Sequence, residues 1–516
     1  MARLKTLMTE ILLHDKSDHS AFRSDLQDEI ISRYNLLDVF KEVLEQEPSE
    51  RIKHLAVCIV LCAKATNDWF LGSIQSAIRE KSFSFMKDIF HLCLVPKVSN
   101  KEHYIFDKND FEGVANMAAT VMSIFNILLE KFSEETTNDQ FQAFLSQISP
   151  DMIYLILEHI KDDFWTSELS RFMAKNLLRL MKLFYECISD EDLLSCNQNL
   201  TNKAAFKSVD HSIMNQLLKI LNPKLTKSNW AKYPSAKSVF AWCLFHTSYP
   251  NLYENLEKVL PPALNFIDDY VMANRISGIQ CLQHIMENVS AEELRWYGHA
   301  DVVYQALKHQ LYTNEAELNE ASFPAILTIL KIVEKIPVVS DSQMDRKTAK
   351  HDEVIQIILL NAECENKIIL RQIVTSFLGD FVDIMGLSTV KHLQRILKVI
   401  ESYLEVYEGP EEITRINVLN LLEKVLKNTW PRIPSHMENI LRMLLKFLCS
   451  LAIQDSSRTE TVTMLLTEKV TTCLKLLKVI GGDKCENLIK SVDSPQLPPL
   501  CINVLKDVQY SVDCTG

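Results

Sequence analysis

Candidate helices follow one another at nearly equal intervals in the carboxy-terminal half of the chain. They begin near Lys367, Ser388, Pro410, Ser435 and Thr459, with roughly 21 to 25 residues from one start to the next. Two helices per unit give about 45 residues, inside the range of about 40 to 47 residues that is typical of HEAT repeats. The spacing therefore predicts an all-α fold, an α-solenoid of HEAT-like helical repeats, with roughly 20 to 26 helices stacked as antiparallel pairs.

Glycine is scarce, which excludes several other fold classes. The 516 residues include 10 Gly and 16 Pro, well below average usage of roughly 7% and 5%. Tight hairpins, phosphate loops and dinucleotide folds need glycine for positive φ and close backbone approach. No sustained period-two alternation bounded by Asn-Gly or Asp-Gly occurs, and none of the usual hydrolase, metalloprotease, phosphate-loop or kinase motifs is found. The sequence therefore predicts a protein that is not an enzyme.

Polar breaks in the helical pattern indicate where the chain divides. Such breaks run over 95–110, 195–208 and 340–352, and a chain of this length exceeds the size of one compact core. The middle break is the preferred division. It predicts an irregular amino-terminal helical region over 1–209 and a HEAT-like α-solenoid over 210–516.

The charge balance and the distribution of apolar residues bear on possible ligands. With 67 acidic and 55 basic residues the net charge is −12, which disfavours nucleic acid as a ligand. The best local basic stripe, an alternative phosphate site, consists of Lys224, Lys227, Lys232 and Lys237. The longest uninterrupted apolar run, residues 55–63, is far shorter than the roughly 18 residues of a membrane span. We therefore expect neither nucleic acid nor membrane as a partner, and no secretory leader.

Cysteines and histidines give little support to a metal site. The 13 cysteines are an odd number and none forms a C-x-x-C pair, so we expect reduced core thiols, no metal and no cofactor. Cys58 and Cys62 lie one helical turn apart but in wholly apolar surroundings. His14 and His19 are five residues apart and would not share a helix face.

The stretch FIDDYVMANRISGIQCLQHI, residues 266–285, holds the densest cluster of polar residues and poses a choice between a site and a packing motif. We interpret Asp268, Asp269 and Tyr270 as a turn in which a carboxylate accepts from the amides of the following helix. Arg275 would then reach an aspartate of the adjoining repeat, and Gly278 would permit close helix approach. The alternative is a metal or acid/base pair at the two aspartates.

Two flanking features complete this interpretation of the chain as stacked helices. Pro261 and Pro262 are expected near the start of the preceding helix, where a missing backbone donor is harmless. Glu411 and Glu412 follow a Gly-Pro pair and are expected in the first turn of a later helix, where they suit the helix dipole. Both features predict helix ends rather than chemistry.

Five idiosyncratic strings, in this order, resemble a known family. Together they are similar to the Tti-two family, the smallest subunit of the Triple-T complex, which also contains the Tel-two and Tti-one proteins. The resemblance covers roughly 210–450, whereas 1–210 match the family only in being helical. The strings are LNPKLTKSNWAKYPSAKSVFAWCL at 221–244, DDYVMANRISGIQCLQHI at 268–285, LYTNE at 311–315, YLEVYEGPEE at 403–412 and TWPRI at 429–433.

The resemblance implies a function that the residues alone could not supply. It implies a non-catalytic α-solenoid co-chaperone, bound directly to the Tti-one scaffold and through the complex to Tel-two. With the Hsp-ninety machinery, this complex would support the phosphatidylinositol-kinase-related kinases, including mTOR, ATM and ATR, in the cytoplasm and also in the nucleus. Candidate partner contacts within the matching strings are Tyr312, Glu315, Glu405, Tyr407, Trp430 and Arg432.

Three alternatives stay open at this point. The aromatic candidates could instead fill gaps between repeats. The chain could be a HEAT-repeat scaffold of another complex, of the transport or phosphatase regulatory kind. It could also be an enzyme with an unrecognised site, for which Asp268, Asp269 and Arg275 are the cluster to test.

Overall fold

The computed structural model describes residues 2–13, 20–80, 84–98, 106–132, 139–195, 212–334, 349–453, 458–492 and 497–510. Within these ranges the chain forms the helices α1 to α25 and short 3-10 segments, and apart from a single bridge residue at Ser212 it contains no strand. The predicted all-α fold and helix number are confirmed for the described part of the chain. The helices pack as layered antiparallel pairs, the arrangement of a HEAT-like α-solenoid.

The chain forms two compact units, Met1–Asn265 and Phe266–Gly516. The division predicted at 209/210 falls in the segment 196–211, which lies outside the described residues. The compact units divide later, between Asn265 and Phe266.

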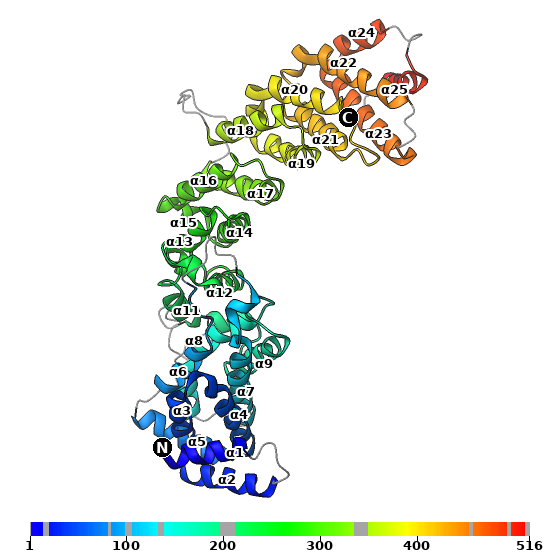
Figure 1. Ribbon diagram of the computed structural model, residues 1–516. Coiled ribbons are helices and arrows are strands. Elements are labelled where there is room, and N and C mark those ends of the chain that lie inside the picture. Colours follow the sequence, from blue (N-terminus) through cyan, green and yellow to red (C-terminus); the bar gives the residue numbers. More distant parts are fainter. Residues whose placement is uncertain are drawn as a thin grey trace. The chain divides into compact units, whose positions relative to one another are not determined.

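The first unit has two helical layers, which Figure 1 shows side by side. One layer holds α1 (Ala2–Leu13), α4 (Pro48–Lys64), α7 (Val114–Phe132) and α9 (Glu168–Phe184). The other holds α3 (Leu36–Glu45), α6 (Ser84–Cys93), α8 (Asp139–His159), α11 (Ile213–Leu221) and α12 (Pro234–Phe245). The remaining elements are α2 (Ser20–Arg33), α5 (Asn67–Glu80), α10 (Asp190–Ser195), α13 (Leu256–Ile267, whose last two residues belong to the second unit), η3 (Lys108–Phe111), η5 (Trp230–Lys232) and η6 (Tyr253–Asn255).

The second unit repeats this layering more regularly. Its inner layer is α14 (Met272–Asn288), α17 (Ala316–Val333), α19 (Ile368–Met385), α21 (Ile413–Asn428) and α23 (Glu460–Gly481). Its outer layer is α16 (His299–Gln310), α18 (Lys350–Cys364), α20 (Leu393–Leu404), α22 (Ile433–Ala452) and α25 (Pro499–Tyr510), with α15 (Ala291–Trp296), η7 (Gly386–His392) and α24 (Asp483–Ser491) between helices. Figure 1 shows the rows α18–α20–α22 and α19–α21–α23 running next to each other.

The predicted helix starts agree with the structure at four of five positions. Helices begin within about three residues of the predicted starts near Lys367, Pro410, Ser435 and Thr459, and Thr459 is the N-cap of α23, accepting from the backbone N–H of Val462. The exception is Ser388, which lies inside η7, so that α20 begins only at Leu393.

Two helical stretches, 108–131 and 368–404, are long and apolar enough to span a membrane by length and composition. Neither stretch is an uninterrupted apolar run, because each contains polar residues. Of their most apolar windows, 50% and 44% are buried inside the fold. In the first, α7 packs against α4 and α9, and in the second, α19 packs against α17 and α21.

The antiparallel order places alternate turns of the second unit on the same edge. Four turns, 268–271, 312–315, 365–367 and 405–412, each precede an inner-layer helix, as do the described residues 453 and 458–459 before α23, and they therefore share one edge, which we call the arginine edge. Hydrogen bonds from one of these turns to the next, between Asn314 and Glu365 and between Arg458 and Glu412, support this placement. The turns 386–392 and 429–432 follow inner-layer helices and lie on the opposite edge.

Candidate partner-binding edge of the second unit

The turn before α14 shows what the two adjacent aspartates do. Asp269 Oδ2 accepts hydrogen bonds from Asn274 Nδ2 at 2.7 Å and from the backbone N–H of Val271 at 3.3 Å. The N-cap of α14 is Val271, and no side chain caps this helix. The expectation of a carboxylate cap was therefore only partly right, since Asp269 ties down the turn and the N-cap amide rather than the helix amides. Among the described residues, no group of three or more His, Cys, Asp or Glu side chains could hold a metal ion.

Gly278 confirms the predicted close approach of helices. A Cβ at this position would lie 2.8 Å from the Cα and 2.9 Å from the Cβ of Ile267, at the end of α13. The expectation for Pro261 and Pro262 is wrong. Helix α13 begins at Leu256, after η6, so both prolines lie inside the helix rather than near its start.

Arg275 does not bind an aspartate of the adjoining repeat, which corrects the prediction. Its Nε and Nη2 donate to Gln310 Oε1 at 2.8 and 2.6 Å, and Nη2 also donates to Thr313 Oγ1 at 2.9 Å. Gln310 in turn donates to the carbonyl of Ile267 at 3.3 Å. The role is the predicted one, joining one repeat to the next, but a neutral glutamine and a threonine take the place of the carboxylate.

Equivalent positions in the next two inner helices make similar contacts. The fourth residue of α14 is Arg275, that of α17 is Asn319 and that of α19 is Arg371. Asn319 Nδ2 donates to Asn314 Oδ1 at 3.1 Å, and the Asn314 amide bonds to Glu365 in the following turn of the edge. In α17 the polar side chain of the first turn thus ties down the turn that precedes the helix, whereas Arg275 of α14 binds the turn of the next repeat.

Arg371 continues the series one repeat further. Its Nε and Nη2 donate to the carbonyl of Glu365 at 2.9 and 2.7 Å, and its guanidinium lies 4.7 Å from the ring centroid of Tyr403. The Tyr403 hydroxyl donates to the carbonyl of Ala362 at 2.8 Å. Burial raises the pKa of Tyr403 to about 12, so this hydroxyl stays a donor at neutral pH.

The last step joins three buried charges. Glu412 accepts from Arg415 Nη1 at 2.9 and 3.0 Å and from Arg458 Nε at 3.0 Å. Its side chain has no exposed surface, and those of Arg415 and Arg458 are 5% and 6% exposed. Burial is the largest influence on the pair, raising the pKa of Glu412 and lowering that of Arg415, while the facing charges oppose both shifts.

Glu412 also has an unusual backbone. It is the N-cap of α21 with φ of +50°, the left-handed region that side chains other than glycine rarely adopt. Glu412 was expected in the first turn of the helix as a partner of the helix dipole, and this expectation is wrong because Glu412 is the N-cap. The left-handed turn points its carboxylate inward at the two arginines.

Each turn of the arginine edge also exposes a large apolar or aromatic side chain. Tyr270, Tyr312, Ile369, Tyr407 and Ile453 are 64%, 65%, 53%, 39% and 74% exposed, one in or beside each successive turn. The ring of Tyr407 lies 5.9 and 5.7 Å from the guanidinium carbons of the two arginines that bind Glu412. The result is a row of exposed side chains over a hydrogen-bonded polar base.

The six candidate partner contacts divide between the two edges. Tyr312, Glu315, Glu405 and Tyr407 lie in turns of the arginine edge, whereas Trp430 and Arg432 lie in the 429–432 turn of the opposite edge. Trp430 is 59% exposed, so it does not fill a gap between repeats. Sequence reasoning missed Ile369 and Ile453, and it treated Tyr270 as structural. All three residues lie in or beside alternate turns between predicted helices, and this spacing could have indicated them from the sequence.

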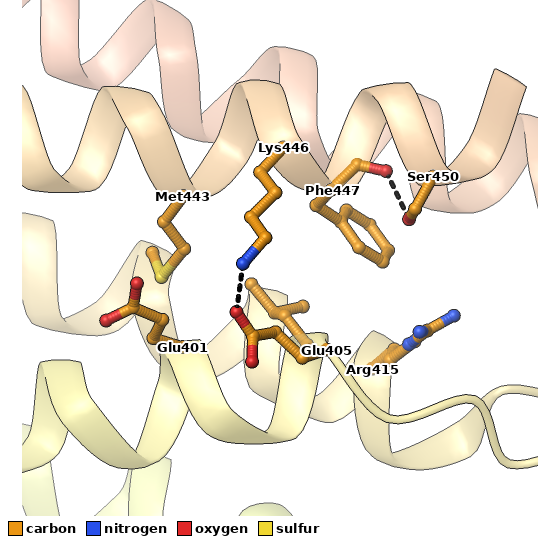
Figure 2. A pocket seen from close by; sticks show the side chains of 8 residues that line it. Glu401, Glu405, Arg415, Met443, Lys446, Phe447 and Ser450 are labelled. Carbon is orange, nitrogen blue, oxygen red and sulfur yellow. Dashed lines mark hydrogen bonds and ion pairs between the residues drawn. The ribbon is translucent and has the colours of Figure 1, made fainter.

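A pocket opens between α20 and α22 near the arginine edge (Figure 2). In Figure 2, Lys446 extends from α22 to Glu405, the residue that follows α20, and Arg415 lies beside the ring of Phe447. The Lys446 Nζ to Glu405 Oε1 distance is 2.5 Å, and the volume of the pocket is about 180 Å³. The lining residues are Glu401, Leu404, Glu405, Arg415, Met443, Lys446, Phe447 and Ser450.

The alternative phosphate stripe serves the fold of the first unit. Lys224 Nζ donates to the Tyr154 hydroxyl at 3.0 Å and lies 4.1 Å from that ring, and burial lowers the pKa of Lys224. Lys232 Nζ bonds to Asn229 Oδ1 at 3.4 Å, and the charge of Lys237 acts on Asp163. These amines face different protein groups, so they do not converge on a phosphate site.

The same string also covers a buried carboxyl group. Glu158 of α8 accepts from Ser235 Oγ at 2.6 Å and from the backbone N–H of Val95 at 3.0 Å. Burial raises the pKa of Glu158 to about 7. The next residue, His159, is also buried, and burial lowers its pKa to about 4. The string 221–244 is thus partly a packing motif against α8.

The expectation of core thiols is right for eight of the eleven described cysteines, whereas Cys187 and Cys449 are half-buried and Cys364 is exposed. Eleven described cysteines are free, and Cys58 and Cys62 are buried in α4. Burial raises the pKa of Cys62 to about 12, which keeps it protonated. His14, His19, Cys196 and Cys514 lie outside the described residues.

Known proteins resemble this chain over most of its length. A family model described as the Tti2 (Tti-two) family matches residues 152–410. TELO2-interacting protein 2 of the rat, Rattus norvegicus, is 34% identical over 367 residues, covering 71% of this chain and 70% of the relative. The chain belongs to the Tti2 family. The human protein of the same name is 32% identical over 398 residues, covering 77% of this chain and 76% of the relative.

The family match confirms the resemblance and extends it. It begins at residue 152, in α8, so the Tti2 family resemblance includes part of the region 1–209 that matched only in being helical. It ends at residue 410, within the 405–412 turn. Among solved structures, yeast importin-β (Kap95p) gives a TM-score of 0.43 at 14% identity, covering 99% of this chain and 62% of that chain. Neither the Tti2 family nor the helical fold indicates an enzyme.

Proposed function

We propose that this chain is a non-catalytic scaffold subunit of the Triple-T complex, bound directly to the Tti-one scaffold and linked through it to Tel-two. With the Hsp-ninety machinery, the complex would support maturation and stability of phosphatidylinositol-kinase-related kinases, in the cytoplasm and in the nucleus. One observation carries the proposal: relatives that are 32 to 34% identical over most of the chain bear the name TELO2-interacting protein 2.

The arginine edge supports the proposal physically. Proteins without catalytic chemistry act through surfaces, and interface anchors are commonly aromatic side chains with a polar edge, such as tyrosine. Tyr270, Tyr312 and Tyr407 are exposed in three of the turns along this edge. The hydrogen bonds beneath them hold the turns in one arrangement, which lowers the conformational entropy lost on binding. We therefore place the scaffold contact on this edge.

The decisive experiment compares the two edges in the full-length chain. Tyr312→Ala combined with Tyr407→Ala should release the scaffold protein from complexes purified at native abundance, because each true anchor contributes about 2 kcal/mol or more. Trp430→Ala combined with Arg432→Ala removes comparable exposed side chains from the opposite edge and should leave the complex intact. If the second pair releases the scaffold and the first does not, the contact is on the opposite edge and our placement is wrong.

The role in kinase stability has its own test. Depleting the protein should lower the steady-state amounts of the kinases while their messenger levels stay constant, because folding and assembly fail rather than synthesis. The unaltered chain should restore these amounts, and the Tyr312→Ala, Tyr407→Ala variant should not. Constant kinase amounts after depletion would contradict this part of the proposal.

A further inference from the structure

We propose that the pocket between α20 and α22 binds an extended, basic segment of a partner protein, with one large apolar side chain in the pocket. The inference deepens the proposed function, on which it rests only in taking the occupant to be an assembly partner. Three observations carry it: the size and walls of the pocket, a cluster of unpaired polar atoms beside it, and an acidic rim.

The pocket has the volume and walls of a site for one apolar side chain. Its volume of about 180 Å³ is close to that of an engineered apolar cavity of about 150 Å³ that binds benzene. Leu404, Met443 and Phe447 form its apolar walls and are themselves buried. A leucine, methionine or phenylalanine side chain matches this size. Exposed Val406, at the start of the 405–412 turn, extends the apolar surface beyond the pocket.

Three buried polar atoms, one of them in the pocket lining and two in residues near it in the sequence, have no hydrogen-bond partner. They are Arg415 Nε, Thr414 Oγ1 and Glu408 Oε1. Arg415 lines the pocket, and Arg415 and Thr414 are 4% and 0% exposed. Buried polar groups are nearly always paired in proteins. A donor and acceptors in one place match a peptide group, which offers both a carbonyl and an N–H.

The charges around the pocket select a basic occupant. Glu401 and Glu405 line the pocket and are exposed, and Lys446 pairs with Glu405. Glu408 and Glu411 of the adjoining 405–412 turn are half-buried and exposed, respectively, and add to the negative charge of this part of the edge. The guanidinium of Arg415 already forms an ion pair with Glu412. An acidic segment would therefore be repelled by the carboxylates around the pocket and would find no unpaired cation there to bind. Lysine or arginine side chains on either side of the apolar anchor would instead be attracted to the rim.

Selection from a random library of twelve-residue peptides tests the proposal with purified full-length chain. Enriched peptides should carry one large apolar residue flanked by lysine or arginine. Their binding should weaken at least tenfold in Ser450→Phe, which fills the pocket from α22, and in Glu405→Lys, which reverses a rim charge. Glu438→Lys makes the same charge change elsewhere on α22, where the carboxylate pairs with Arg442, and should bind like the original chain. Thermal melts show that each variant is folded.

Raising the salt concentration should also weaken binding, because the rim charges are exposed. Enrichment of acidic peptides, peptides that bind Ser450→Phe unchanged, or no enrichment at all would each overturn the proposal. Peptide binding is measured without other subunits, so it can succeed even where copurification with the Tti-one scaffold fails. The two proposals can therefore fail separately.

Discussion

Replacing Gly278 by alanine tests the close approach of α14 to Ile267, which belongs to the same unit. The added Cβ would meet backbone and Cβ atoms of Ile267 at 2.8 and 2.9 Å, and a backbone cannot rotate away as a side chain can. We therefore take the upper part of the usual overpacking range, about 3 kcal/mol. Alanine regains about 1 kcal/mol of helix propensity, so the net loss is about 2 kcal/mol. For a unit of this size that lowers the melting temperature by about 4 to 8 °C.

Gly379→Ala is the matched control, because Gly379 lies mid-helix in α19 of the same layer. Its added Cβ would meet only the flexible Lys424 side chain, 2.9 Å from Cδ. Lys424 can move, so this variant should stay within about 1 kcal/mol of the original chain. Thermal melts and amide hydrogen exchange of α14 and α19 provide the measurements. If the two alanine variants behave alike, or if Gly278→Ala is the more stable one, the argument from close approach is wrong.

Three further predictions concern buried polar groups. Burial raises the pKa of Glu158 from 4.5 to about 7, so between these pH values the folded chain binds more protons than the unfolded chain, and the stability that this group contributes is lost as the pH rises. In urea titrations the stability of Glu158→Gln relative to the original chain should therefore increase by about 3 kcal/mol from pH 4.5 to 8. A stability difference that does not change with pH would contradict this. Glu412→Gln leaves Arg415 and Arg458 without a facing charge and should lose about 3 kcal/mol in the same assay, whereas an unchanged midpoint would show that the pair contributes little. All 13 cysteines should be alkylated after unfolding without reductant, and any deficit in the mass spectrum would reveal a disulfide.

The helical architecture could be predicted because it depends on local patterns. Apolar periodicity, sparse glycine and regular helix starts are properties of short segments, and four of five predicted starts agree with the structure. The exception near Ser388 has a local cause. Gly386 adopts φ of +52° and the chain forms a 3-10 segment before α20 begins, which apolar periodicity alone does not indicate.

The contacts between repeats could not be predicted in the same way. Arg275 was correctly expected to join two repeats, but its partner depends on which turn lies opposite, and that turn supplies Gln310 and Thr313. Glu412 looked like a first-turn residue, yet its left-handed backbone turns the carboxylate toward Arg458, 46 residues further along the chain. Such pairings depend on the stacking of distant segments and leave no local signal.

One physical rule connects the hydrogen bonds at the inner-layer helix starts, the exposed side chains of the arginine edge and the pocket. At α14, α17 and α19 the polar side chain in the first turn has hydrogen-bond partners in the turn behind it or in the next repeat. These turns are thereby fixed, and their exposed side chains can contact a partner with little ordering. At α21 the third residue, Arg415, binds Glu412 through Nη1, but its Nε has no partner, and Thr414 Oγ1 and Glu408 Oε1 are also unpaired. A buried polar atom without a partner costs about 1 to 3 kcal/mol, so a peptide group of a bound segment gains most at this step. That step lies beside the apolar pocket, and the proposed occupant is therefore a peptide segment rather than a small apolar molecule.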